Sequence, residues 1–388
     1  MEFACISRRG LLKAACAAAF GSVCTPRLLP AEVVERRPRH HRVQILVASA
    51  ELTDRRYVAF PALLDCGDEV LVSFKRGRSH AADPGAALEL LRLDPATGHA
   101  SRPQTIAQLD DHIMQMGEWV RFPNGDIASY IDVQVKGDGT TRAGLRVVRS
   151  TDGGKTFGPL ERVGTVDGVE YGYAFHAIVE QRTTWLLAMR FSSLTGGKAV
   201  HPRRPHAGSV DVIRSDDSGR TWRFVRNLSR EFGDVSINES TLIRQGDGFL
   251  ISTRGYDDRQ RVHLTDASFR VLRQVDLTAI HPFITSHLGR PRLFVRDDRV
   301  YLLGRNWTAA PRVMQLCLFR LDPATLTVLA YSILDNAARE AVYDGYYAMP
   351  YFREVGAATM LYVVDYKAIK GQSAPDILQH EYRWDEVK

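Results

Sequence analysis

Four arginines occupy the same place in four similar segments of the chain, and this pattern has the clearest chemical meaning. Each one closes a short apolar run with the composition of a β-strand. These arginines are Arg76, Arg190, Arg254 and Arg305. A guanidinium offers a carboxylate two parallel charge-assisted hydrogen bonds, so arginines gathered at one place form a binding site for an anionic ligand. That chemistry requires a fold that brings the ends of distant strands together.

A short turn motif repeats along the chain and indicates what that fold is. Residues 150–157 and 215–222 both carry Ser first, Asp third, Gly fifth, Thr seventh and an aromatic residue eighth. In such a segment the Asp side chain accepts hydrogen bonds from the N–H groups of its own turn, and Gly supplies a positive φ. We expect each copy to be a hairpin turn that the aromatic side chain anchors.

Weaker copies of the turn define a period. Arg-Leu-Asp-Pro-Ala-Thr occurs at 92–97 and again at 320–325, and a degenerate copy lies at 265–269. The turn aspartates are therefore Asp94, Asp152, Asp217, Asp266 and Asp322, roughly 57 residues apart on average, a spacing typical of propeller blades. The predicted fold class is all-β: one six-bladed β-propeller over residues 32–388. We expect the strand at 43–47 to close the ring by pairing with the last blade.

The motif at 150–157 and 215–222 resembles the Asp box of sialidase-type β-propellers, and the resemblance covers nearly all of residues 32–388. It implies an exo-sialidase-like glycoside hydrolase, in which three arginines hold the carboxylate of an acidic sugar. It also implies a Tyr–Glu nucleophile pair, an Asp acid/base and net retention through a covalent glycosyl–tyrosine intermediate. The implied binding partner is a sialylated glycan or another acidic sugar.

The resemblance assigns catalytic roles to individual residues. Glu239, in Asn238-Glu239-Ser240, matches the family's glutamate. Tyr346, which follows Asp344-Gly345, matches the nucleophile, and Tyr347 is the alternative. Asp83, five residues beyond an arginine in the loop after the second strand of blade one, matches the acid/base, and Asp111 is the alternative.

The resemblance also assigns the residues that bind the sugar carboxylate. Arg254 matches the family's second arginine, and Arg312 matches the third, with Arg305 as its competitor. The first arginine is missing, because Ala59 stands in its place in Val58-Ala59-Phe60-Pro61. Arg76, on the next strand of the same blade, is the expected substitute. This departure leaves open whether the ligand is sialic acid, another ulosonic acid or a uronic acid.

Two other functions compete with a sialidase. A non-catalytic Asp-box propeller that binds glycan or protein would keep the repeat without the catalytic Tyr–Glu–Asp set. A polysaccharide lyase or a glycosidase acting on a uronate would use the same cationic pocket. A catalytic site requires Glu239, Tyr346 and Arg254 to converge at one rim of the ring, whereas a binding propeller does not.

The N-terminus predicts a segment that is separate from the fold. Arg8 and Arg9 precede a weakly apolar run at 14–23, and this order resembles a twin-arginine export signal over residues 1–31. We therefore expect a periplasmic or secreted protein. No other stretch is long and apolar enough to predict a membrane span.

Composition narrows the remaining classes of function. With 51 basic and 45 acidic residues and no block of like charge, the chain lacks the basic surface typical of nucleic-acid binding. There is no helical pair of zinc-ligand histidines, no Gly-rich phosphate loop and no Gly-x-Ser-x-Gly motif. The sequence therefore predicts no cofactor and no metal. A closed propeller buries its own core, so we expect a monomer.

Overall fold

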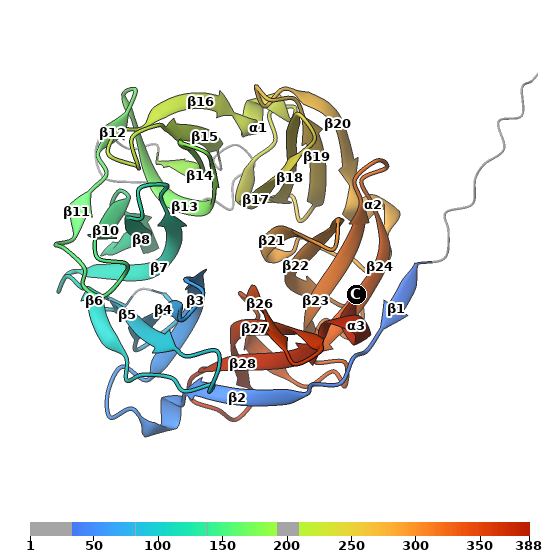
Figure 1. Cartoon of the computed structure of the whole chain (residues 1–388), viewed down its shortest axis with the longest axis horizontal. Coiled ribbons are helices and arrows are strands. Elements are labelled where there is room, and N and C mark those ends of the chain that lie inside the picture. The colour runs from blue at the N-terminus through green and yellow to red at the C-terminus, as the bar shows by residue number, and fades with distance from the viewer. Residues whose placement is uncertain (1–32, 82, 138, 192–208) are drawn as a thin grey trace, which may run out of the picture. The chain divides into compact units, whose positions relative to one another are not determined.

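The computed structural model describes residues 33–81, 83–137, 139–191 and 209–388, and Val33–Lys388 form one compact unit. Its regular structure is almost entirely β-strand, arranged as six sheets around a ring (Figure 1). The predicted six-bladed β-propeller is thus confirmed. Residues 1–31, where the export signal is expected, lie outside the described residues.

Each blade is an antiparallel sheet whose first strand lies nearest the centre of the ring. Blade one contains β3 (Tyr57–Asp65), β4 (Val70–Gly77), β5 (Ala87–Leu93) and β6 (Gln104–Ala107). Blade two contains β7 (His112–Arg121), β8 (Ile127–Gly137), β10 (Arg146–Ser150) and β11 (Glu161–Arg162), with β9 (Gly139–Arg142) added to β8. Blade three contains β13 (Val169–Glu180), β14 (Thr183–Phe191), β15 (Val210–Ser215) and β16 (Arg223–Asn227), with β12 (Thr165–Val166) added to β13.

The other half of the ring follows the same plan. Blade four contains β17 (Ile237–Gln245), β18 (Gly248–Gly255), β19 (Gln260–Thr265) and β20 (Val271–Asp276). Blade five contains β21 (Gly289–Arg296), β22 (Arg299–Trp307), β23 (Met314–Asp322) and β24 (Thr327–Asp335). Blade six contains β26 (Met349–Val355), β27 (Ala358–Ile369) and β28 (Asp376–Arg383), and β25 (Val342–Gly345) also pairs with β27.

Helices are few and short in the part of the chain that the structure describes. They are η1 (Ser49–Glu51), α1 (Leu228–Glu231), α2 (Leu277–Ile280) and α3 (Trp384–Val387). None of these described helices has the length and apolar character needed to cross a bilayer.

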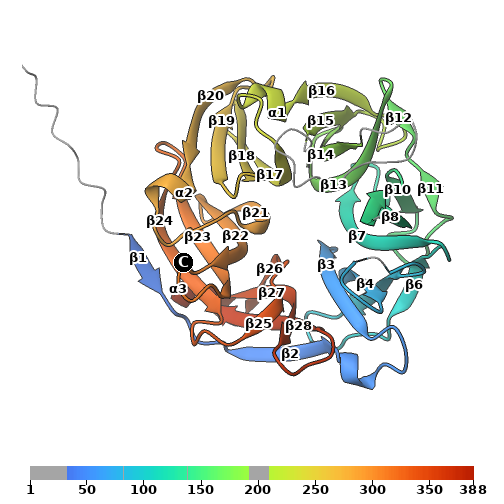
Figure 2. The same ribbon diagram turned by 180° about the vertical axis from the view of Figure 1, so that it is seen from behind.

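The first two described strands complete the last two blades of the ring. β2 (Arg42–Val47) pairs with β28 as the outer strand of blade six, and β1 (Val34–Arg36) adds in parallel to β24 of blade five (Figures 1 and 2). This confirms the predicted closure by residues 43–47. Because β2 covers the outer edge of blade six, the sheet that would otherwise end in an open strand is joined to the start of the ring.

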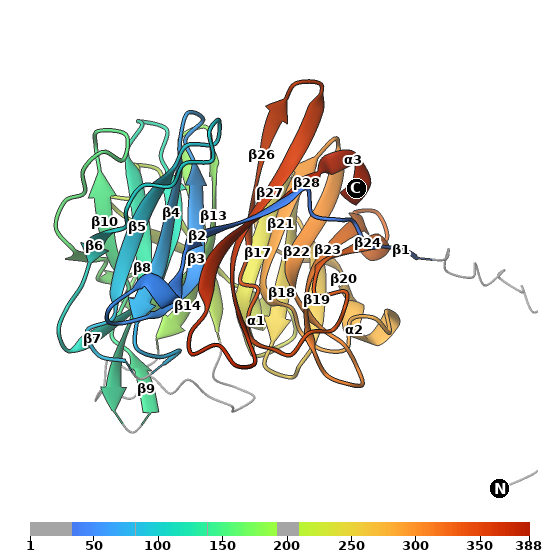
Figure 3. The same ribbon diagram turned by 90° about the horizontal axis from the view of Figure 1, so that it is seen from below.

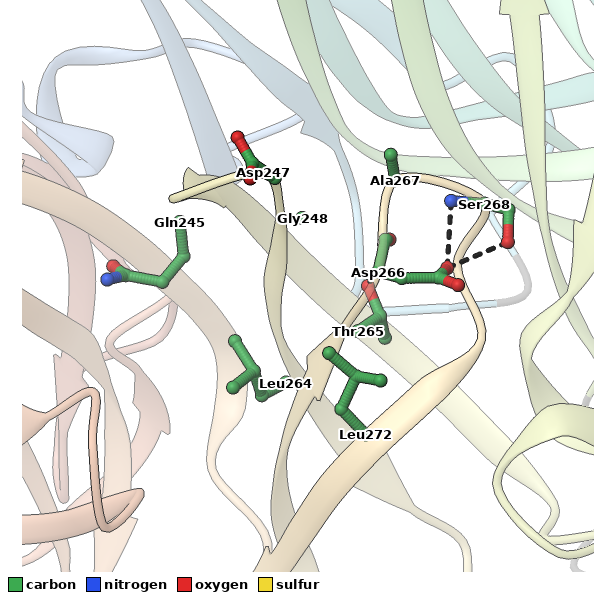
Figure 4. A pocket seen from close by; sticks show the side chains of 9 residues that line it. All are labelled: Gln245, Asp247, Gly248, Leu264, Thr265, Asp266, Ala267, Ser268 and Leu272. Carbon is green, nitrogen blue, oxygen red and sulfur yellow. Dashed lines mark hydrogen bonds between the residues drawn. The ribbon is translucent and has the colours of Figure 1, made fainter.

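The repeated turns all lie between the third and fourth strands of blades one to five. Asp217 Oδ1 accepts hydrogen bonds from the N–H groups of Arg220 and Thr221 at 3.1 and 2.9 Å, and Thr221 Oγ1 donates to Asp217 Oδ2 at 2.6 Å. Asp152 has the matching bonds with Thr156. The expected turn geometry is therefore confirmed, and the degenerate copy at Asp266 keeps its bonds to Ser268 (Figure 4).

The fifth position of the turn tests this geometry. Gly219 has φ 72°, and a Cβ there would lie 2.4 Å from Phe122 Cζ and 2.5 Å from the Tyr130 hydroxyl. Gly153, at the fourth position of the other copy, has φ 74° but nothing within 4 Å of its Cβ position. We predict that Gly219→Ala lowers the free energy of unfolding by at least ~2 kcal/mol more than Gly153→Ala, because only Gly219→Ala adds a clash to the unfavourable φ. Urea unfolding of both variants measures this, and equal losses would contradict it.

Candidate active site

The innermost strands depart from regular pairing at the same rim of the ring. Their register shifts near the start of the strand in β3, β7, β13, β17 and β21. In blade six, residues 346–348 interrupt the pairing between β25 and β26. Figure 3 shows this rim from the side, with β9 extending beyond it and the β26–β27 hairpin beyond the opposite rim. Such bulges redirect side chains, and here they redirect them toward the centre.

A buried ion cluster crosses the ring below this rim. Glu118 of β7 pairs with Arg290 and Arg292 of β21, from blades that face each other across the centre (Figure 1). Arg290 Nη2 donates to Glu118 Oε2 at 3.1 Å, and Arg292 Nη1 donates to Glu118 Oε1 at 2.9 Å. All three side chains are almost fully buried. These ion pairs connect opposite sides of the ring. We call the cluster of Glu118, Arg290 and Arg292 the floor of the site.

Glu239 contacts that floor through the backbone of Arg290 and accepts three hydrogen bonds in all. Arg254 Nη1 donates to Glu239 Oε2 at 2.6 Å, the backbone N–H of Arg290 donates to the same oxygen at 2.9 Å, and the Tyr173 hydroxyl donates to Oε1 at 3.2 Å. Burial would raise the pKa of Glu239, but the Arg254 charge and these hydrogen bonds outweigh it and lower the pKa to about 2. Glu239 is therefore an ionised carboxylate at neutral pH.

Tyr347 shares the guanidinium that holds Glu239. Arg254 Nη1 donates to the Tyr347 hydroxyl at 2.9 Å as well as to the carboxylate, so a single nitrogen joins both groups. Burial and the Glu239 charge raise the pKa of Tyr347, while Arg254 and Arg305 oppose that rise. At neutral pH the arrangement holds a neutral phenol beside an ionised carboxylate.

Arg305 completes the cationic side of this site. Its guanidinium carbon lies 4.7 Å from the centre of the Tyr347 ring, and Nη1 donates to the Gly345 carbonyl at 3.3 Å. Its Nε is buried and has no hydrogen-bond partner among the described residues. Arg305 therefore presents a positive charge next to Tyr347 with donor capacity left for an anion.

Tyr346, the predicted nucleophile, points elsewhere. Its φ is 65°, so the backbone turns through the left-handed region, and its hydroxyl donates to Asp335 Oδ2 at 2.7 Å. The side chain is fully buried against that carboxylate. The structure brings Tyr347, the alternative, to Glu239 and Arg254 instead. The left-handed residue reverses the side-chain alternation that would have put Tyr346 on the central face.

Neither predicted acid/base aspartate joins Glu239 and Tyr347. Asp83 is only 4% exposed, and its Oδ2 accepts hydrogen bonds from the N–H groups of Arg78 and Ser79 at 2.6 and 3.3 Å. The Asp83 carboxylate therefore stabilises the loop in which it lies. Asp111 is exposed and pairs with the adjacent His112 at 2.5 Å.

The first blade also differs from expectation. Arg76 pairs with Asp54 at 3.2 Å, and it is Lys75 that lies opposite Ala59 in the β3–β4 register. The Lys75 ammonium is buried and donates to the carbonyls of Ser79 and His80 and to the Gln115 side chain. Burial lowers the pKa of Lys75 to about 8 against the opposing charge of Asp83. The expected substitution of Arg76 for the missing arginine is therefore not supported by its contacts.

The two candidates for the third arginine have separate positions. Arg312 is exposed, with its guanidinium 4.6 Å from the centre of the Trp307 ring. Arg305 lies against both Trp307 and Tyr347, at 5.4 and 4.7 Å from their ring centres. The structure thus favours Arg305, the competitor, as the arginine beside the nucleophile candidate.

Sequence reasoning missed a histidine at this rim. His80 Nδ1 lies 2.8 Å from Asp344 Oδ2, which also accepts a hydrogen bond from the Tyr57 hydroxyl. The His80 ring stands edge-on to Phe60 at 5.0 Å, and Phe60 contacts the Tyr347 ring at 5.7 Å. The only sequence signal for His80 was its place in the loop that also carries Asp83.

A hollow in blade four lies away from this chemistry. It is lined by residues at the β17–β18 and β19–β20 turns, including Asp247, Asp266 and Leu272 (Figure 4). Because Glu239 is near the start of β17 and this hollow is beyond its end, the two are at opposite rims. The hollow therefore belongs to the turn architecture.

The chain is similar to known proteins in its fold rather than in its sequence. No protein-family model matches the chain, and no curated protein matches its sequence. A structure of a protein of unknown function from Dyadobacter fermentans matches with a TM-score of 0.68 and 14% identity, over 90% of this chain and 99% of that one. The NanB sialidase from Streptococcus pneumoniae matches with a TM-score of 0.60 and 10% identity, over 89% and 71% of the two chains.

An intramolecular trans-sialidase from Ruminococcus gnavus also matches, with a TM-score of 0.56 and 11% identity over 87% of this chain and 96% of that one. The fold is that of the sialidases. The predicted likeness to sialidase propellers is confirmed at this level.

The lowered pKa of Glu239 predicts a pH-dependent contribution to stability. A carboxyl whose pKa is about 2 when folded and 4.5 when unfolded stabilises the fold above pH 4.5, and that stabilisation is lost as the pH falls toward 2. We predict that the stability advantage of the wild type over Glu239→Gln shrinks by about 2 kcal/mol between pH 7 and pH 3. Urea unfolding at the two pH values measures it.

The matched control is Glu161→Gln, at an exposed glutamate of β11. This control should differ from the wild type by the same small amount at both pH values. An advantage over Glu239→Gln that is independent of pH would contradict the proposed electrostatic origin.

Proposed function

We propose that this protein is a retaining glycoside hydrolase that acts on a terminal sugar bearing a carboxylate, with Tyr347 as nucleophile and Glu239 as its base. One observation carries the proposal: Arg254 Nη1 bonds both the Glu239 carboxylate and the Tyr347 hydroxyl. Arg305, stacked on Tyr347, supplies a second cation for the carboxylate of the sugar. The sialidase fold supports the same reaction class by analogy.

A tyrosine suits an anomeric carbon that bears a carboxylate. A neutral phenol approaches that centre without the charge repulsion that a carboxylate nucleophile would meet. The phenol needs a base, and Glu239, which is bonded to the same Arg254 nitrogen, is an ionised carboxylate. As the Tyr347 oxygen bonds to the anomeric carbon, its proton passes to Glu239 and the bond to the leaving oxygen breaks. Water then attacks the glycosyl–tyrosine, and the proton returns from Glu239 to Tyr347.

Proton transfer from Tyr347 must accompany the attack. The pKa of Glu239 is lowered to about 2, whereas burial and the Glu239 charge raise the pKa of Tyr347, so proton transfer before bond formation would be strongly uphill. Bond formation to carbon removes this penalty, because the phenol oxygen loses its negative charge to the new bond.

His80 is the group best suited to protonate the leaving oxygen. Its side chain is 55% exposed, and the buried carboxylate of Asp344 orients its ring through Nδ1. Imidazole is the commonest general acid and base in enzymes. We therefore assign to His80 the role that the sequence assigned to Asp83, whose Oδ2 is already bound by two backbone N–H groups. In the second step the neutral His80 takes the proton of the attacking water.

Blade one favours a uronic or other acidic sugar as a second candidate substrate. With Ala59 in place of an arginine and Lys75 bonded to backbone carbonyls, Arg254 and Arg305 remain to hold the carboxylate. The substrate panel must therefore contain uronides as well as α-sialosides.

The nucleophile is tested with a pair of adjacent variants on aryl α-sialosides and aryl uronides. Tyr347→Phe should lower kcat/KM by at least about 10³-fold, because no oxygen remains to attack. Tyr346→Phe, which loses only its bond to Asp335, should keep most of the activity. Circular dichroism checks that both variants fold. Equal activity of Tyr347→Phe and the wild type would refute the assignment, and a wild type inactive on every sugar would favour a binding propeller.

The acid is tested by changing the leaving group. His80→Gln should slow substrates with an alkyl leaving group by ~10²–10⁴-fold and substrates with a nitrophenyl leaving group far less, because nitrophenolate leaves without a proton. Asp83→Asn should lower thermal stability and affect both substrates alike. If Asp83→Asn shows the leaving-group dependence and His80→Gln does not, the acid is Asp83.

A further inference from the structure

A second cluster of polar side chains lies away from the candidate active site, where the chain closes the ring. His40 lies in segment 37–41, which joins β1 to β2, Asp335 ends β24 of blade five, and His380 lies in β28 of blade six. Each of the three offers one potential ligand atom, and these atoms lie within 4.8 Å of one another. We infer that His40, Asp335 and His380 bind a divalent transition metal of the zinc class.

The orientation of His380 is the strongest support. Its Nε2 lies 3.1 Å from Asp365 Oδ1, and an ionised carboxylate there accepts the Nε2 proton. Nδ1 is then the ring nitrogen left for a metal, and metal binding displaces any proton that it carries. The His380 side chain is only 1% exposed, and its Nδ1 has no hydrogen-bond partner among the described residues. A carboxylate behind a histidine is the usual support for a metal ligand.

The other two ligand atoms are also available. His40 Nε2 makes no hydrogen bond within the described residues and lies 3.7 Å from Asp335 Oδ1. Asp335 uses its other oxygen, Oδ2, to accept from Tyr346 and Lys367, each at 2.7 Å. Two imidazole nitrogens and one carboxylate oxygen thus lie within 4.8 Å of one another.

The donor set selects the kind of metal. Two imidazoles and a carboxylate suit zinc and its neighbours, whereas calcium and magnesium prefer oxygen ligands alone. Zinc–ligand distances of ~2.0–2.1 Å put tetrahedral ligand atoms ~3.4 Å apart. His40 Nε2 and Asp335 Oδ1, at 3.7 Å, are close to that value, and we expect the partly exposed His40 side chain to move inward when a metal binds.

The local charge allows a cation, although Lys367 lies beside it. Lys367 pairs with Asp335 and also lies 3.9 Å from Glu340. The local charge thus consists of two cations against three carboxyl groups. The cations are Lys367 and Arg39, which lines the same cavity, and the carboxyl groups are those of Asp335, Asp365 and Glu340. This cavity of about 370 Å³ is also lined by His40 and Asp335 and has room for a water molecule as fourth ligand.

A metal at this site would connect three segments of the chain at the place where the ring closes. His40 belongs to the segment that joins blades five and six, and the other two ligands come from one blade each. Asp335 also holds the Tyr346 hydroxyl, one residue before Tyr347. The predicted role is structural, and it does not depend on the proposed reaction.

The test is a titration of the untagged full chain, stripped with EDTA, with Co²⁺ and Zn²⁺. The wild type should bind one Co²⁺ with visible absorption typical of nitrogen and oxygen ligands, and Zn²⁺ should displace it and raise the melting temperature. His40→Gln should weaken binding at least about 10-fold, whereas His41→Gln, at the exposed neighbour, should not. Asp365→Asn should weaken binding through His380 without removing a ligand.

Two results would overturn the inference. One is no stoichiometric binding of either metal by the wild type. The other is equal binding by the wild type and His40→Gln, which would put the metal on other groups, such as the cysteines at positions 5, 16 and 24.

Discussion

The pairing of Glu118 with Arg290 and Arg292 is the interaction on which the site depends. It joins opposite blades through the centre of the ring, where burial makes unpaired charges very unfavourable. Removing one member of such a buried cluster generally costs roughly 3–5 kcal/mol, because the remaining charges lose their partners. The same Arg290 donates its backbone N–H to Glu239. The position of Glu239 above the floor is therefore set by the ion pairs below it.

The shared use of Arg254 has a consequence for the proposed reaction. While Arg254 Nη1 bonds Glu239, it keeps the proton affinity of that carboxylate low. In the proposed reaction, an anionic sugar that binds Arg254 competes for the same guanidinium. The proton affinity of Glu239 would then rise, so substrate binding would itself activate the proposed base.

The architecture could be predicted from the sequence because its signals are local and repeated. The Asp turns give the blade period, and the apolar strand at 43–47 has no partner nearby, so its pairing with the last blade follows from closure. Glu239 and Arg254 could be found because each lies near the end of an apolar strand that the sequence shows, although the β17–β18 register shifts between Ile237 and Ser240. These features need no knowledge of how neighbouring blades pack.

The positions of the remaining site residues depend on irregular backbone conformations that the residue types do not predict. Phe60, Arg290 and Tyr346 all have positive φ, an unfavourable region for large side chains, and all three lie at the same rim. At Tyr346 this reverses which tyrosine faces the centre. In β4, strand alternation puts Lys75 rather than Arg76 opposite Ala59. His80 and the His40–Asp335–His380 cluster depend on contacts between segments that are far apart in the chain.

The closure of blade six makes the ring depend on two segments that lie far apart in the chain. β2 is synthesised before any of the blades, whereas its partner β28 follows all the other described strands. A nascent chain in which β28 has not yet emerged leaves β2 as a bare edge strand, prone to wrong pairing and recognisable to proteases and chaperones. The closed ring thus delays the protection of β2 until the last blade has been made.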